Sequence, residues 1–146
     1  MTLTVFLALL AVGTALWLVP RFTQTAHRRR AEARAAALMG SLCPGSLVAT
    51  RGDDGFGVAK ILAIDPGAVH IRLYQERFPA LERVRLDLPR TLGSFGGGKP
   101  FSVGHLPLSP QSFLSWQPVS VGFEPVTEDE LEGYRIWQES QGGVFG

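Results

Sequence analysis

Residues 47–74 read LVATRGDDGFGVAKILAIDPGAVHIRLY, and this stretch decides the fold that is expected for the chain. Two turn signals divide it, Gly-Asp-Asp-Gly at residues 52–55 and Asp-Pro-Gly at residues 65–67. Glycine and proline supply the backbone angles that tight turns require. The apolar and β-branched runs between these signals predict antiparallel strands joined by hairpins. The expected strands cover residues 47–51, 56–64 and 68–74.

Two further strands and a short helix are expected after this stretch. Apolar and charged side chains alternate over residues 84–88, which predicts a fourth strand, and residues 119–123 predict a last one. Ser109 followed by Pro110 is typical of a helix start, so a short helix is expected over residues 110–116.

A C-terminal helix is expected from Thr127 to about Ser140, because Thr127 and Glu130 have the spacing of a capping box. The aromatic residues of the last third are interpreted as the core between this helix and the sheet, with an aromatic binding groove as the alternative. They are Phe113, Trp116, Phe123, Tyr134 and Trp137. The expected fold class is α+β: a small antiparallel β domain, either a meander or an SH3-like barrel, with a C-terminal helix.

The N-terminal stretch predicts a transmembrane helix ahead of this domain. Residues 1–20 carry no charged side chain, and a helix of about 20 residues crosses a bilayer core of about 30 Å. Leu3 lies near its start, Trp17 falls where an aromatic belt is expected, and Arg21 follows directly. Residues 1–22 are therefore interpreted as a membrane anchor in contact with the lipid bilayer.

A basic segment follows the anchor and sets its expected orientation. Residues 23–43 are rich in alanine and arginine, which predicts a juxtamembrane helix. Its cluster of Arg28, Arg29 and Arg30 is expected to stay on the cytoplasmic side. This predicts a single-pass protein of the cell membrane with its N-terminus outside and residues 44–146 as a soluble cytoplasmic domain. The hairpin around Gly55 resembles those of many small bacterial β domains, without indicating a family.

A cleaved signal peptide is the main alternative to a retained anchor. Such a peptide needs a basic start, an apolar core of roughly 7–15 residues and a small-residue cleavage site. No basic side chain precedes the apolar run, and the small residues at 35–37 come only after the arginine cluster. The retained anchor is therefore favoured.

Charge and cysteine content exclude several classes of function. Residues 1–45 carry five arginines and one glutamate, so +4, and residues 46–146 carry nine basic and twelve acidic side chains, so −3. A nucleic-acid partner is not expected, because such a protein normally carries its basic patch on the folded domain. Cys43 is the single cysteine, so an intramolecular disulfide and an all-cysteine metal site are excluded.

No motif predicts catalysis, a metal or a cofactor. Residues 93–99 match the first letters of a phosphate-binding loop, but Pro100 stands where a serine or threonine must hold magnesium. The histidines share no metal-ligand spacing with each other or with Cys43. We therefore expect no cofactor and no catalytic residue, although a triad assembled from distant positions stays open.

The best candidate for a functional contact is the glycine- and proline-rich loop at residues 92–106. Aromatic side chains on such a loop are better placed for contact than buried ones. The candidate contact residues are Phe95, Lys99, Phe101 and His105. The favoured hypothesis is a non-catalytic module that binds another membrane or cytoplasmic protein. The alternative is a membrane-tethered enzyme that uses the loop as an active-site lid, and a homo-oligomer is left open by a weak small-residue spacing at Ala11 and Ala15.

Overall fold

The computed structural model of the chain describes residues 28–93 and 100–146. The chain divides into two compact units, Met1–Ser41 and Leu42–Gly146. In the first unit residues 28–41 are helical, and Arg28 pairs with Glu32 one turn later at 2.8 Å. Within the two described ranges, no helix has both the length and the apolar character needed to cross a membrane. The expected anchor at residues 1–22 lies outside those ranges.

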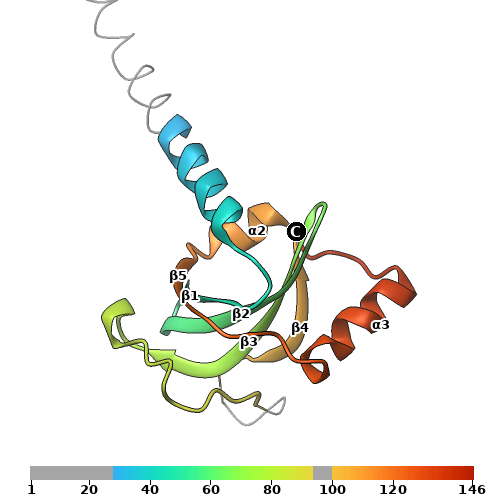
Figure 1. Cartoon of the computed structure of the whole chain (residues 1–146). Coiled ribbons are helices and arrows are strands. Elements are labelled where there is room, and N and C mark those ends of the chain that lie inside the picture. The colour runs from blue at the N-terminus through green and yellow to red at the C-terminus, as the bar shows by residue number, and fades with distance from the viewer. Residues whose placement is uncertain (1–27, 94–99) are drawn as a thin grey trace, which may run out of the picture. The chain divides into compact units, whose positions relative to one another are not determined.

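The second unit contains an antiparallel five-stranded sheet in the order β4-β3-β2-β1-β5 (Figure 1). Strands β1 to β4 follow one another as a meander, and β5 returns to pair with β1. Helical segments lie between the later strands and after the last one, so the expected α+β class with a small antiparallel domain is confirmed. The strands are β1 (Ser46–Gly52), β2 (Gly55–Asp65), β3 (Ala68–Phe78), β4 (Val103–Leu108) and β5 (Val119–Phe123).

The first two hairpins form where the turn residues predict them. Gly55 has φ +108° and Gly67 has φ +86°, a region of backbone conformation that side chains rarely adopt. These glycines close the turns between β1 and β2 and between β2 and β3. Strand β3 continues four residues beyond the predicted end at residue 74.

Short helical segments follow β3, β4 and β5 along the chain. Ser109 Oγ accepts a hydrogen bond from Ser112 N at 3.1 Å, which confirms the predicted cap of α2. The backbone N–H of Thr127 donates to Glu130 Oε2 at 2.9 Å, which is one half of the predicted capping box. The segments are η1 (Leu81–Arg83), α2 (Pro110–Ser115), η2 (Asp129–Leu131) and α3 (Glu132–Ser140).

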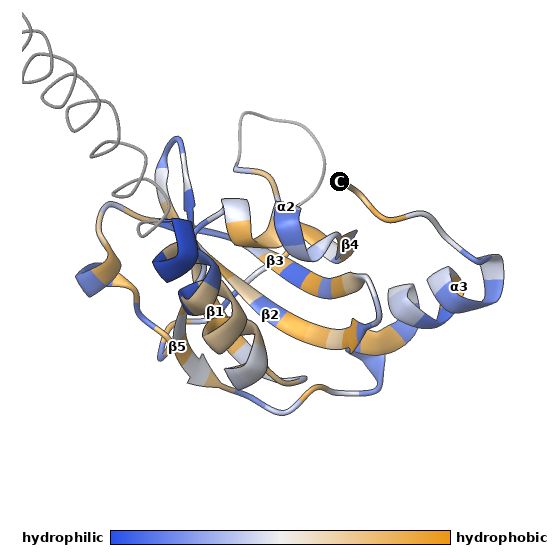
Figure 2. Ribbon diagram, turned by 90° about the horizontal axis from the view of Figure 1, so that it is seen from above, coloured by the Kyte–Doolittle hydropathy of each residue, from blue (hydrophilic) through white to orange (hydrophobic). Residues whose placement is uncertain are grey.

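The hydrophobic core lies against the middle strands, β2 and β3, which carry much of the hydrophobic sequence (Figure 2). Ile61 and Ile71 are fully buried neighbours on these strands, and Phe113 of α2 is also fully buried. His70 alternates with the apolar Val69 and Ile71, so in a half-buried strand it would face solvent, but it is fully buried too. Both faces of β3 are covered there, one of them by Tyr134 and Trp137 of α3.

The predicted fourth strand at residues 84–88 is wrong. This segment is irregular, and the fourth strand of the sheet is β4. Val84 and Leu86 instead pack on a buried cluster of Leu47, Val58 and Tyr74. An extended segment that lies on a core buries every second side chain without joining a ladder, so its alternation resembles that of a strand.

Strand β4 was not predicted, because Gly104 and Pro107 both weaken a strand signal. Proline is tolerated here because β4 is at the edge of the sheet. The carbonyl of Pro107 accepts a hydrogen bond from Phe145 N at 2.9 Å, and Phe145 O accepts from Ser109 N at 2.8 Å. The C-terminal tail therefore covers part of this edge.

A buried ion network ties the segment after β5 to the sheet. Lys60 Nζ lies 2.8 Å from Glu130 Oε2 and 3.2 Å from Glu124 Oε1, and its side chain is fully buried. Arg72 contacts the other carboxylate oxygen of Glu130 at 3.1 Å. Burial alone would raise the pKa of Glu130, but hydrogen bonds from Lys60, the backbone of Thr127 and Arg72 outweigh it and lower the pKa to about 2.

Candidate functional site

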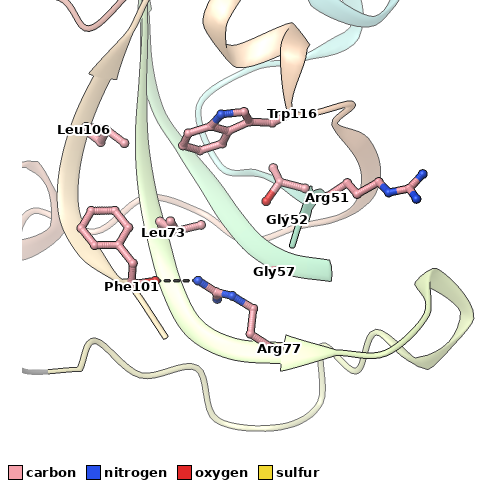
Figure 3. Close-up of a pocket in the computed structure, with 9 residues that line it drawn as sticks. Arg51, Gly52, Gly57, Leu73, Arg77, Phe101, Leu106 and Trp116 are labelled. Carbon is pink, nitrogen blue, oxygen red and sulfur yellow. Dashed lines mark hydrogen bonds between the residues drawn. The ribbon is translucent and has the colours of Figure 1, made fainter. Parts of the chain in front are cut away.

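The clearest candidate site is an apolar pocket of about 250 Å³ at one end of the sheet (Figure 3). We call it the aromatic pocket. Segments that are far apart in sequence contribute to it: β1, β2, β3, the segment before β4, β4 itself and the residue that follows α2. Its lining residues are Thr50, Arg51, Gly52, Gly57, Leu73, Arg77, Phe101, Leu106 and Trp116.

Two aromatic rings and two leucines form the walls. Phe101 and Trp116 lie on either side of Leu73, while Leu106 projects from β4 (Figure 3). Phe101 is 51% exposed, which is high for a phenylalanine beside an apolar pocket. Large aromatic side chains around a concavity are the usual anchors of protein recognition.

Arg77 shapes the floor of the pocket by tying β3 to the segment before β4. Its guanidinium donates to the backbone oxygens of Tyr74 at 2.7 Å, Glu76 at 2.9 Å and Phe101 at 2.6 Å. Burial lowers the pKa of Arg77, and the nearby charge of Asp54 opposes this. Arg77 therefore holds the backbone at Phe101 in place.

Gly57 allows Arg77 to lie across the neighbouring strand. A Cβ at residue 57 would meet Arg77 Nη1 at 3.1 Å and Cζ at 3.3 Å, which is closer than ordinary contact. The glycine in β2 is thus explained by the close approach of the guanidinium. A side chain at this position would require the Arg77 guanidinium to shift by a few tenths of an ångström.

The lining of the pocket is mainly apolar, with few polar side chains. Among the described residues that line it, the polar side chains are Thr50 and two arginines, without a carboxylate, histidine or cysteine. General acid–base catalysis and nucleophilic catalysis both require such groups or an activated hydroxyl beside them. The Arg51 side chain extends away from the pocket (Figure 3), so the rim is positively charged.

The structure brings one of the four predicted contact residues into this pocket. Phe101 lines it, whereas His105 lies in β4, next to Leu106. Successive strand residues point to opposite faces, and His105 contacts His70 and Tyr134 instead. Phe95 and Lys99 lie outside the described residues. The predicted loop at 92–106 is also shorter, because residues 103–106 belong to β4.

The predicted aromatic core divides between four environments. Phe113 is in the core, Trp116 lines the aromatic pocket and Phe123 is 61% exposed. Tyr134 and Trp137 pack against His70. Phe113 therefore fits the core interpretation, whereas Trp116 lines a pocket, as in the alternative interpretation.

Sequence reasoning missed Arg77 and Leu106 as pocket residues. Arg77 had no signal, because its role depends on carbonyls that the fold brings together. Leu106 would have been recognised only after β4 was placed. Within residues 28–93 and 100–146, no three histidine, cysteine or acidic side chains are grouped so that they could hold a metal ion. Comparisons with protein-family models, curated proteins and solved structures find no match to this chain.

Proposed function

We propose that this chain is a single-pass membrane protein whose domain at residues 42–146 binds a partner protein without catalysing a reaction. The observation that carries the proposal is the aromatic pocket, which has the exposed Phe101 and the half-buried Trp116 as walls and lacks acid–base groups among its described lining residues. The strand order supports an SH3-like barrel as our interpretation of the domain, because β5 returns to β1. The fold itself carries no function, so the argument rests on the pocket.

The membrane part of the proposal rests on the sequence. The uncharged residues 1–20 and the arginines at 21, 28, 29 and 30 support an anchor with the basic flank in the cytoplasm. Anionic lipids of the cytoplasmic leaflet attract such a flank and repel the mildly acidic domain. The partner is therefore another protein at the membrane or in the cytoplasm next to it.

We expect a reporter enzyme that is active only in the cytoplasm to be active when it is fused after Gly146. The excess of arginines after the anchor supplies the physical reason. Changing Arg28, Arg29 and Arg30 together to glutamate is expected to lower this activity, because the orientation signal is removed. Activity of a reporter that works only outside the cytoplasm, or a mature chain that begins after residue 20, would contradict the anchor.

The pocket is proposed to take a large apolar side chain from an extended segment of the partner. Phe101, Leu106 and Trp116 supply apolar contact on several sides, and the arginine rim favours acidic residues beside the inserted one. A volume of about 250 Å³ is enough for one large side chain but not for a folded element.

Phe101→Ser is expected to weaken partner binding at least tenfold. Truncation of an aromatic anchor at the centre of an interface commonly costs 2 kcal/mol or more, which exceeds a tenfold change. The measurement is the affinity between the purified chain and the partner that co-purifies with it from membranes. Phe123→Ser is the matched control, because Phe123 is 61% exposed and lies on β5 away from the pocket lining. Equal affinities of the two variants would contradict partner binding at the aromatic pocket.

A further inference from the structure

A second site lies beside β4, where α3 packs on the sheet next to two histidines. His70 of β3 is fully buried, and its Nδ1 lies 2.9 Å from Nε2 of His105 in β4. The two imidazole planes differ by 4° and their centroids are 5.2 Å apart, which fits an edge-to-edge N–H···N hydrogen bond. We call these two residues the histidine pair.

Helix α3 contacts the histidine pair through its aromatic side chains. The rings of Tyr134 and Trp137 meet His70 edge-on, with centroid distances of 4.8 and 4.5 Å. Gly133 allows the close approach, since a Cβ there would lie 2.6 Å from His105 Cβ. The helix begins at Glu132, the residue before Gly133, and Figure 1 shows α3 on the β4 side of the sheet.

Charged groups from each neighbouring element face the pair. Asp65 at the end of β2 has its Oδ2 3.2 Å from His70 Nε2, but the geometry is not that of a hydrogen bond. The same oxygen accepts a hydrogen bond from the Tyr134 hydroxyl at 2.9 Å. A cavity of about 460 Å³ opens beside His105. The charged residues that line this cavity are Arg72 of β3, Asp129 and Glu130 of η2 and Glu132 of α3.

The number of protons bound to the pair decides whether its hydrogen bond can form, so the pair is sensitive to acid. A neutral pair shares one proton along its hydrogen bond, and a singly protonated pair still has one donor and one acceptor. A second proton places two N–H groups against each other and two like charges in contact. Burial, followed by the charge of His70, lowers the pKa of His105 to about 4, and burial also lowers the pKa of His70 against the opposing effect of Asp65.

The α3 segment has few other attachments. Among its described residues none is fully buried, and Ile136 is 58% exposed. The tail after α3 has two attachments. Trp137 Nε1 donates a hydrogen bond to Gly143 O at 2.9 Å, and Phe145 makes two backbone hydrogen bonds at the β4 edge. Segments with few buried apolar contacts are the first to open while the rest of a domain stays folded.

We propose that protonation of the histidine pair in mildly acidic conditions releases α3 and the tail at residues 141–146 from the sheet. The device is independent of the aromatic pocket, because His105 and Leu106 face opposite sides of β4. Release would uncover the fully buried His70 and the charged cavity beside His105.

The direction of the pH response follows from the proton balance. Released histidines regain ordinary pKa values near 6.5, so below pH 6.5 the released state binds more protons than the docked state. The contribution of the pair to docking is therefore fully present well above pH 6.5 and weakens as the pH falls toward 4. For His105 alone, the released population is expected to rise roughly 50- to 100-fold between pH 7.5 and 4.5. Glu130 stays ionised in this window, because its pKa is about 2.

Hydrogen exchange of the purified full-length chain tests the proposal. After correction for intrinsic rates, exchange of the α3 amides is expected to rise roughly 50-fold between pH 7.5 and 4.5, while β2 amides stay within about twofold. His105→Gln keeps a hydrogen-bonding side chain that does not titrate, so the α3 response should fall below about fivefold. An α3 response below fivefold in the unmodified chain, or a response of α3 and β2 by the same factor, overturns the proposal.

A direct titration keeps the proposal testable if His105→Gln does not fold. Nitrogen chemical shifts of the two histidines are measured in the His27→Gln chain, in which His70 and His105 are the only histidines. We expect His105 to titrate below pH 5 in the docked chain, while the exchange of α3 already rises as the pH falls from 6.5. Titration of His105 near pH 6.5 while α3 stays protected contradicts the proposal.

Discussion

Replacing Glu130 with alanine is expected to lower the free energy of unfolding by about 3–5 kcal/mol. Glu130 holds the fully buried Lys60 at 2.8 Å and Arg72 at 3.1 Å, and its own side chain is 10% exposed. Without it, the partners that remain for Lys60 among the described residues are Glu124 at 3.2 Å and the carbonyl of Pro125 at 2.8 Å. A buried cation that loses its closest carboxylate pays most of its desolvation cost without compensation.

Glu128→Ala is the matched control, two residues earlier in the same segment. The Glu128 side chain is 83% exposed and pairs with Arg135, which is 49% exposed. Exposed pairs of this kind contribute less than about 1 kcal/mol. Chemical denaturation of the purified chain measures both variants. Equal losses of stability for Glu128→Ala and Glu130→Ala would show that the buried network does not stabilise the domain.

Phe113→Ala is expected to cost about 3–5 kcal/mol of unfolding free energy. Phe113 is the large side chain that α2 places in the core, and it is fully buried. Its removal loses apolar burial and leaves a cavity that a short helix between two strands has little room to close. Phe123→Ala should cost less than about 1 kcal/mol, because Phe123 is 61% exposed. A loss below 1 kcal/mol for Phe113→Ala would contradict the position of α2 against the sheet.

Local chemistry predicted the first three strands and both of their turns. The glycines and proline of residues 52–55 and 65–67 restrict the chain so strongly that distant contacts change little there. The cap of α2 was predicted for the same reason, since Ser109 bonds to an amide three residues away. These elements depend on neighbours in sequence, which a sequence displays directly.

Strand β4 and the segment at residues 84–88 depend on distant contacts instead. Alternation reports which side chains are buried, but a strand is defined by backbone partners on another segment. Residues 84–88 have the alternation without a partner strand, whereas β4 has β3 as its partner despite Gly104 and Pro107. The strand that was missed and the strand that was wrongly predicted therefore have one physical cause.

The same distinction applies to the sites. Phe101 was predicted because an aromatic residue in a glycine- and proline-rich loop stands out in the sequence. Its pocket neighbours Arg77 and Trp116 come from different elements, and their proximity is a property of the fold. The hydrogen bond of the histidine pair joins residues 35 positions apart, and no motif links them. Sites assembled from single residues of several strands are not visible before the strand order is known.

Photo-crosslinking in intact membranes tests the proposed partner binding most directly. A photoreactive phenylalanine analogue is placed at position 101 in the aromatic pocket, at position 106 on its β4 wall, or at position 123 on β5 as a control. We expect one discrete adduct with the same partner protein from positions 101 and 106, and no such adduct from position 123. The absence of an adduct from both pocket positions, or the same adduct from all three positions, would contradict partner binding at the aromatic pocket.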